Sequence, residues 1–173
     1  MPKLRPRKRA PSIVYVGVDP GISGGLAWLT ELPATRIVEA TPMPATERDI
    51  CDWFAALSSK HTAIVAMIES VHAMPQNAVR AAFRFGWGYG GLRMALIAAR
   101  IPFQEVRPQD WQKAMGIPPR KKRKKEFVES KTQFKNRLKS KAQQLFPSVD
   151  VTLKTADALL ITEYCYRKHN GQL

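Results

Sequence analysis

Three acidic residues that are far apart in the sequence each stand at the end of an apolar segment. Asp19 ends the apolar run that begins at Ile13, and Glu69 ends the run that begins at Ala63. Asp157 lies just before a helical stretch with one apolar face. Strand ends converge at one edge of an open α/β sheet, and three acids gathered there repel one another unless a cation lies between them. Oxygen ligands without His or Cys favour Mg²⁺ or Mn²⁺.

This pattern of acids predicts phosphodiester hydrolysis. Two divalent cations about 3.5–4 Å apart stabilise both the attacking and the leaving oxygen of an in-line displacement. Glycines that follow Asp19 would let a phosphate approach without meeting a Cβ; they are Gly21, Gly24 and Gly25. Alternatively, Asp19 caps a plain β-hairpin, and Asp157 is one of the acids that helix N-termini commonly carry. The inference therefore depends on Asp19, Glu69 and Asp157 together.

The charge of the chain indicates a polyanionic partner. Its 173 residues suit one domain, and 28 Lys and Arg against 14 Asp and Glu give a net charge of +14. A folded chain with this balance favours nucleic acid or an anionic membrane. No apolar run approaches the roughly 20 residues of a membrane span. Nucleic acid is therefore the expected partner.

The elements that must position these acids follow from hydrophobic periodicity. Short β-branched runs bounded by turn residues predict strands at 12–18, 25–30, 36–40, 63–69 and 102–106. Apolar residues at helical spacing predict helices at 46–60, 77–100, from 108 onward, in the second half of the basic 118–141 segment, and at 155–168. This order predicts an α/β domain with one mixed central sheet flanked by helices.

Residues 1–11 read as a flexible basic arm, and residues 12–173 as a single domain with a mobile basic loop at about 118–130. The two cysteines, Cys51 and Cys165, lack the spacing of a zinc site and lie in apolar helical contexts. We expect both to be reduced core residues, which favours a reducing compartment.

Several motifs together resemble a known family. The segments "VGVDPGISGGLAW", "MIESVHAMP", "GWGYGGLRMAL", "VRPQDWQKAMGI", "KSKAQQLFP" and "ADALLITEY" occur in the order found in RuvC-like Holliday junction resolvases, and are most similar to the phage and organellar branches. The resemblance runs from Val14 to about Tyr166. It implies a ribonuclease H-like fold, a homodimer, and metal-dependent paired nicking of four-way DNA junctions inside the cell. An organellar matrix is the second expected location.

The resemblance also assigns the acids. Asp19 matches the metal ligand of the first strand, Glu69 the acid that ends the fourth strand, and Asp157 the acid of the last helix. The family usually has a further acid or a histidine shortly before the position of Asp157, where this chain has Lys154. Either Asp150 takes that role, or three acids suffice, or the chain is a weakened form. The alternative function is therefore a non-catalytic protein that binds branched or single-stranded DNA.

DNA contacts are expected at three places. His72 and Gln76 follow Glu69, and the resemblance places this segment beside the cleaved strand. Lys113 matches a basic position of the family near the DNA path. A run of six basic residues is expected to contact phosphates, which positions DNA without reading its sequence; the run is Arg120, Lys121, Lys122, Arg123, Lys124 and Lys125.

The 77–100 helix is the expected dimer surface. Its glycines, Gly86, Gly90 and Gly91, permit close helix approach, and Leu92, Leu96 and Ile97 would supply buried area. Aromatic residues recur along the same stretch, at Phe83, Phe85, Trp87 and Tyr89. Stacking on exposed bases would use such residues, but packing within the helical core explains most of them.

Overall fold

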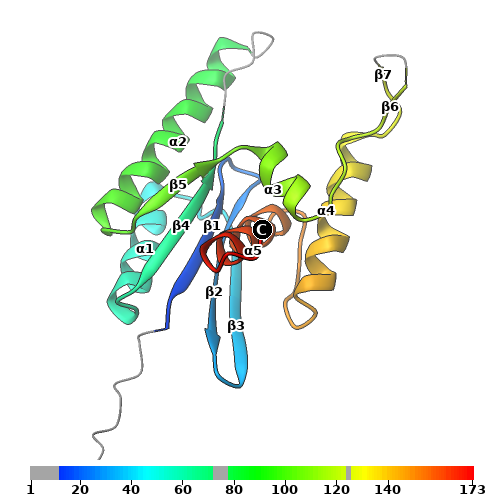
Figure 1. Cartoon of the computed structure of the whole chain (residues 1–173). Helices are drawn as coiled ribbons and strands as arrows, with labels where there is room; N and C mark the ends of the chain where they lie inside the picture. Colours follow the sequence, from blue (N-terminus) through cyan, green and yellow to red (C-terminus); the bar gives the residue numbers. More distant parts are fainter. Residues whose placement is uncertain (1–11, 72–77, 124–125) are drawn as a thin grey trace, which may run out of the picture.

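The computed structural model describes residues 12–71, 78–123 and 126–173, and within this part it shows a mixed five-stranded sheet (Figure 1). The strand order is β3-β2-β1-β4-β5. Strand β1 pairs antiparallel with β2 and parallel with β4. The strands are β1 (Val14–Asp19), β2 (Gly25–Leu32), β3 (Thr35–Pro42), β4 (Ile64–Glu69) and β5 (Phe103–Val106). The sheet therefore confirms the predicted α/β class.

Helices cover both faces of this sheet (Figure 1). They are α1 (Glu47–Lys60), α2 (Val79–Ala98), α3 (Pro108–Ala114), α4 (Lys131–Leu145) and α5 (Ala156–His169). One hydrophobic cluster joins the sheet to α1 and α2, and the other joins it to α3, α4 and α5. Helices α1 and α4 each begin with a capping box, formed by Thr46 and Ser130 with the third residue of each helix, which satisfies backbone N–H groups at the helix start.

The alternation of side chains along a strand decides which layer each acid faces. On β1, Val16 and Val18 pack in the cluster under α1 and α2, whereas Tyr15 packs in the cluster under α5. Asp19 shares the parity of Tyr15, and Glu69 on β4 shares that of Met67, which also packs under α5. Both acids therefore face the layer that contains α5.

Gly17 allows α5 to lie directly on β1. A Cβ at this position would stand 2.3 Å from the carbonyl oxygen of Ala158 and 2.4 Å from the backbone nitrogen of Thr162. The Thr162 hydroxyl is itself within hydrogen-bond distance of the carbonyl oxygens of Ala158 and Ala27. The close approach fixes the first turn of α5, and with it Asp157, beside the end of β1.

The basic segment expected as a mobile loop includes two short paired strands, β6 (Lys122–Arg123) and β7 (Glu126–Phe127). One expectation needs correction: Cys165 is buried as expected, but Cys51 on α1 is exposed. Helix α2 is continuous over its twenty residues, glycines included. Within the described residues, no helix has the length and apolar character needed to cross a bilayer.

Candidate active site

Three acids from separate elements gather at one end of the sheet. The parallel register pairs Val18 with Ile68, which makes Asp19 and Glu69 neighbours at the ends of β1 and β4. Asp157 lies in the first turn of α5, on the same side of the sheet. Asp19 and Asp157 are only 7% and 5% exposed. The fold thus brings together carboxylates that are 50 or more positions apart in the sequence.

Burial and mutual repulsion favour the protonated forms of these acids. Burial raises the pKa of Asp19 well above its usual range, and the nearby charges of Asp157 and Glu69 raise it further. Burial also raises the pKa of Glu69, to about 7, and that of Asp157. A cluster of this kind, at the carboxyl ends of parallel strands, is typical of a functional site.

Lys135 is a fourth charged member of the site. It lies on α4, and its ammonium group forms an ion pair with Oδ2 of Asp157. Partial burial acts to lower the pKa of Lys135, but the charges of Asp157, Asp19 and Glu69 and the hydrogen bond to Asp157 outweigh it and raise the pKa. Lys135 therefore stays positively charged and offsets part of the acidic charge.

Trp111 orients Glu69. The indole of Trp111 is fully buried in the middle of α3, and its Nε1–H donates to Oε2 of Glu69 over 2.8 Å. This hydrogen bond acts to lower the pKa of Glu69, against the effect of burial. The packed ring thus fixes one oxygen of Glu69 and leaves the other available for a ligand.

The acids offer the donors that a hard cation requires. Oδ1 of Asp157 is buried and accepts no hydrogen bond from the described residues, and the three carboxylates, of which Asp19 and Asp157 are buried, repel one another. In the conformation observed for residues 12–71, 78–123 and 126–173, however, no three His, Cys, Asp or Glu side chains are close enough together to hold a metal ion. Lys135 supplies the counter-charge instead. The donor chemistry fits Mg²⁺ or Mn²⁺, and binding would require the carboxylates to draw closer.

The glycines after Asp19 have a structural role that differs from the expected one. A Cβ on Gly24 would lie 2.1 Å from the carbonyl oxygen of Asp19, and one on Gly25 would lie 2.7 Å from that of Lys154. Gly21 has a φ of 110°, which side-chain-bearing residues rarely adopt. These glycines let the chain pack tightly around Asp19, and this contact explains them without any approach of a phosphate.

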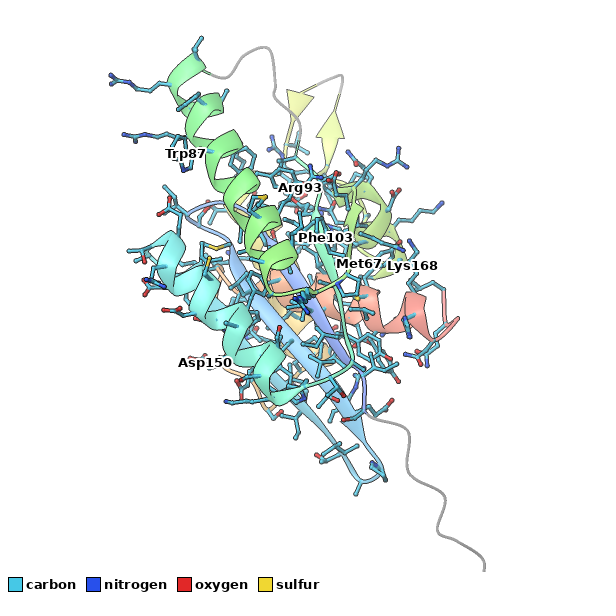
Figure 2. All side chains as sticks on the ribbon, turned by 90° about the vertical axis from the view of Figure 1, so that its left-hand side faces the viewer. Met67, Trp87, Arg93, Phe103, Asp150 and Lys168 are labelled. Atoms are coloured by element: carbon cyan, nitrogen blue, oxygen red, sulfur yellow. The ribbon has the colours of Figure 1, made fainter. Side chains whose placement is uncertain are left out.

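The charged residues on either side of Asp157 in the sequence supply no fourth acid to the cluster. Asp150 is exposed in the connection between α4 and α5, and it is not among the charges that shift the pKa values of the three acids (Figure 2). Glu163 is buried, but it forms ion pairs with Arg36 and Arg167. Lys154 is exposed just before α5.

The predicted DNA contacts are only partly described. Lys113 is exposed on α3, and Lys121 is exposed at the start of the hairpin. Arg120 is half-buried next to it. Lys122 and Arg123 form β6 through their backbones, and their side chains lie outside the described part of the structure. The other predicted contacts lie outside the described residues, namely His72, Gln76, Lys124 and Lys125.

Glu129 attaches the basic hairpin to α4. Its carboxylate accepts hydrogen bonds from Nε and Nη2 of Arg137 and from the backbone N–H of Lys121. The bonds from Arg137, and then that from Lys121, lower the pKa of Glu129 to about 2. The hairpin is therefore held against the helix that carries Lys135.

Helix α2 exposes a different set of residues from the one expected at a dimer surface. Leu92 and Leu96 are buried in the protein's own core, because they face β1 and β4, whereas Ile97 is exposed. Phe83 and Trp87 are 67% and 66% exposed, so core packing does not explain them (Figure 2). A Cβ on Gly86 or Gly90 would meet open space.

Comparison with solved structures supports the predicted fold. Thermus thermophilus RuvC in complex with a Holliday junction substrate aligns with a TM-score of 0.58 and 16% identity, over 92% of this chain and 97% of that chain. A second T. thermophilus RuvC structure aligns with a TM-score of 0.54 and 17% identity over the same shares. The protein therefore has the fold of RuvC, a ribonuclease H-like fold, as predicted.

Other comparisons add less. The yeast mitochondrial Holliday junction resolvase Ydc2 aligns with a TM-score of 0.43 and 14% identity, over 92% of this chain and 81% of that chain. No protein-family model and no curated protein sequence matches the chain.

Proposed function

We propose that this protein is a metal-dependent endonuclease that resolves four-way DNA junctions by paired nicking. The observation that carries the proposal is the meeting of Asp19, Glu69 and Asp157 at one end of a sheet with the RuvC fold. RuvC itself has been solved with a Holliday junction substrate. The net charge of +14 suits the same polyanionic substrate.

The three acids would share one task in this proposal, which is to hold the metal ions. Asp19, Glu69 and Asp157 would hold two Mg²⁺ or Mn²⁺ ions, with the partnerless Oδ1 of Asp157 as one donor. Bound ions of this kind supply Lewis acidity, which activates a water nucleophile and stabilises the leaving oxygen. Trp111 fixes the orientation of Glu69 through its 2.8 Å hydrogen bond. Ordering the carboxylates in advance lowers the cost of gathering them around cations.

Lys135 reduces the repulsion between this acidic site and a phosphate. Its side chain is 42% exposed, so the ammonium group pairs with Asp157 while it remains reachable from solvent. An incoming phosphodiester meets three carboxylates, and one fixed positive charge beside them partly compensates for their field. We assign Lys135 to substrate positioning.

A junction has two strands to cut, and each chain supplies one set of acids, so the proposal requires a homodimer. Helix α2 carries exposed apolar residues at positions 83, 87, 94 and 97, which with Gly90 follow the alternating spacing of four and three of a helix–helix seam. We name Phe83, Trp87, Met94 and Ile97 the α2 seam. An exposed apolar stripe of this kind typically marks an interface, and a two-fold axis would match the symmetry of the junction.

The alternative proposal is a junction-binding protein without nuclease activity. Lys154 stands close to where the related proteins are expected to carry a further acid, and the described side chains do not adopt a metal-holding geometry. Either function is expected inside the cell, where its DNA substrate lies.

A substrate panel separates these functions. The full-length protein is incubated with a mobile four-way junction, a linear duplex of the same sequence and an RNA–DNA hybrid, each with Mg²⁺ or Mn²⁺ and with a chelator. We expect paired nicks in the junction with either cation and none with the chelator. Cleavage of the hybrid in preference to the junction would indicate a ribonuclease H activity, and binding without cleavage would establish the alternative.

A further inference from the structure

The basic hairpin formed by β6 and β7 is closed at its base by one arginine of α4. Arg137 donates from Nε and Nη2 to the two carboxylate oxygens of Glu129, on the chain that leaves the hairpin, over 2.7 and 3.0 Å. Nη2 of the same guanidinium donates to the carbonyl oxygen of Pro118, on the chain that enters the hairpin, over 3.2 Å. Both ends of the hairpin are therefore attached to the same side chain.

Lys121 completes this closure through its backbone. Its N–H donates to Oε2 of Glu129 over 3.0 Å, and its carbonyl oxygen accepts from the backbone N–H of Val128 over 3.2 Å. The side chain of Glu129 is only 8% exposed, so water competes little for these hydrogen bonds. Glu129 and Arg137 thus order the base of the hairpin before any partner arrives.

Helix α4 connects the hairpin to the acids. The hairpin rises past the end of the sheet at which Asp19 and Glu69 lie (Figure 1). Lys135 pairs with Asp157, whereas Arg137, about 200° further around the helix, holds the hairpin. One helix therefore fixes the position of the hairpin relative to the candidate active site.

The charges at the base of the hairpin are arranged for geometry. The guanidinium of Arg137 is engaged by Glu129 and Pro118, whereas Lys121 bonds through its backbone and leaves its side chain exposed. Glu129 places a carboxylate beside the basic run at 120–125, where charge alone disfavours a DNA partner. The benefit of this acid to a DNA-binding hairpin must therefore come from the structure that it holds.

We infer that Glu129 and Arg137 are positioning residues for DNA, because their ion pair holds the basic hairpin in the orientation that contacts phosphates. A segment that is ordered before binding avoids the entropic cost of becoming ordered on the partner. Loss of the acid should therefore weaken DNA binding, although it makes the protein more positive. The inference rests on the proposed function, in which the hairpin contacts DNA.

Two substitutions separate geometry from charge. Glu129→Gln sets an amide donor against the guanidinium donors and raises the net charge by one. Arg137→Lys keeps the net charge but cannot form the paired hydrogen bonds of a guanidinium to a carboxylate. Asp150→Asn is the matched control for the change of charge, because Asp150 is an exposed acid at the opposite end of α4 from the hairpin (Figures 1 and 2).

The test measures the affinity of the full-length protein for a labelled four-way junction and for a duplex of the same sequence, in a chelator so that no strand is cut. We expect Glu129→Gln and Arg137→Lys each to weaken both affinities by at least about fivefold. Asp150→Asn should leave them unchanged or slightly tighter. Hydrogen exchange at the backbone N–H groups of Lys121 and Val128 should become faster in Glu129→Gln, with little change in Tm.

A double-mutant cycle shows whether Glu129 acts through the hairpin. Lys121, Lys122 and Arg123 are replaced together by glutamine, in the wild type and in Glu129→Gln. The triple substitution should itself weaken binding, because it removes phosphate contacts. In that background, Glu129→Gln should cause little or no further weakening, since the groups that it positions are gone.

The outcomes distinguish this inference from the proposed function. Equal or tighter binding by Glu129→Gln would overturn the positioning role, because charge alone would then decide, and would leave the proposed function intact. Weakening of the same size in the neutralised background, or a large loss of Tm, would assign Glu129 to the stability of the whole domain and also overturn the inference. Failure of the wild type to bind junctions would remove the proposed function, and the inference with it.

Discussion

Helices α5 and α2 have similar apolar content in the sequence but opposite places in the molecule. Every residue of α5 from Ala156 to Cys165 is buried, including Asp157. In α2, which is six residues longer, the buried residues are Leu92, Ala95 and Leu96. The enclosed α5 holds Asp157 in a fixed place, which suits the proposed catalytic role, and the open α2 leaves apolar side chains exposed, which suits the proposed dimer surface.

Glycines show the physical origin of this contrast. Gly17 permits α5 to touch β1, since any Cβ there would collide with the backbone of α5. Gly86, Gly88, Gly90 and Gly91 of α2 face no neighbour within 4 Å. A helix interior loses stability through glycine, so their presence in an exposed helix suits contacts with something outside the chain.

The largest expected effect comes from exchanging glycine for alanine in both regions. Gly17→Ala should lower the free energy of unfolding by about 3 kcal/mol or more, because the methyl group overlaps fixed backbone atoms. Gly88→Ala should raise it by about 0.5–1 kcal/mol, the gain in helix propensity. Urea unfolding measures both. Equal losses in the two variants would contradict the contrast between a closed and an open helix.

A charged substitution tests whether the α2 seam forms the dimer interface. Trp87→Glu should weaken dimerisation by about thirtyfold or more, because a hot-spot aromatic residue contributes about 2 kcal/mol. Ile37→Glu is the control, since Ile37 is also an exposed apolar residue but lies on β3. Sedimentation velocity over a concentration series gives the dimer fraction. A wild type that is strictly monomeric, both alone and on junction DNA, would remove the seam and the paired-nicking proposal.

The enclosed site also predicts a pH dependence of stability in the absence of divalent cations. The pKa of Glu69 is raised from 4.5 to about 7 in the folded protein, so the folded state binds more protons than the unfolded state between these values. The contribution of Glu69 to stability should therefore fall as pH rises through this window. The Tm of Glu69→Gln minus the Tm of wild type should therefore rise by a few degrees between the acid end and the alkaline end of this window. A Tm difference that is independent of pH would refute the raised pKa.

The smallest effect per residue concerns the basic hairpin. Replacing Arg120 to Lys125 by neutral residues should weaken binding to junction and duplex alike, and each lost phosphate contact should reduce the slope of log affinity against log salt by about one. Lys60→Gln and Lys168→Gln are controls, because both lysines lie at the ends of helices remote from the hairpin. An unchanged slope would mean that the run is only solvated.

Much of the fold could be predicted because strand periodicity and strand-end acids are local signals. Asp19 and Glu69 could be recognised as strand-end acids and Asp157 as a helix-start acid from the residues next to them, but only the three together predicted a shared site. The roles of Trp111 and Lys135 could not, since both depend on contacts across 42 and 22 positions of the chain. One signal was present for Lys135, which is one turn before the buried Leu138 and so faces inward on α4.

Surface and core could not be separated within α2. The pattern there predicts Leu92 and Leu96 as interface residues and Phe83 as core, and the structure reverses both. Apolar periodicity indicates that a helix has an apolar face. Helix α2 has two apolar faces, one packed on the sheet and one exposed on the outside. Only the position of the sheet, which ends below the N-terminal half of α2, decides between them (Figure 1).

The most direct test of the central claim is cleavage of a mobile four-way junction in Mg²⁺ by wild type and by Asp19→Asn, with junction binding measured in parallel. The account predicts paired nicks by the wild type and no cleavage by Asp19→Asn, with binding that is equal or tighter because a negative charge near phosphate is lost. Asp150→Asn, an exposed acid outside the cluster, should still cleave. Cleavage retained by Asp19→Asn would contradict the claim that this carboxylate holds the catalytic metal ions.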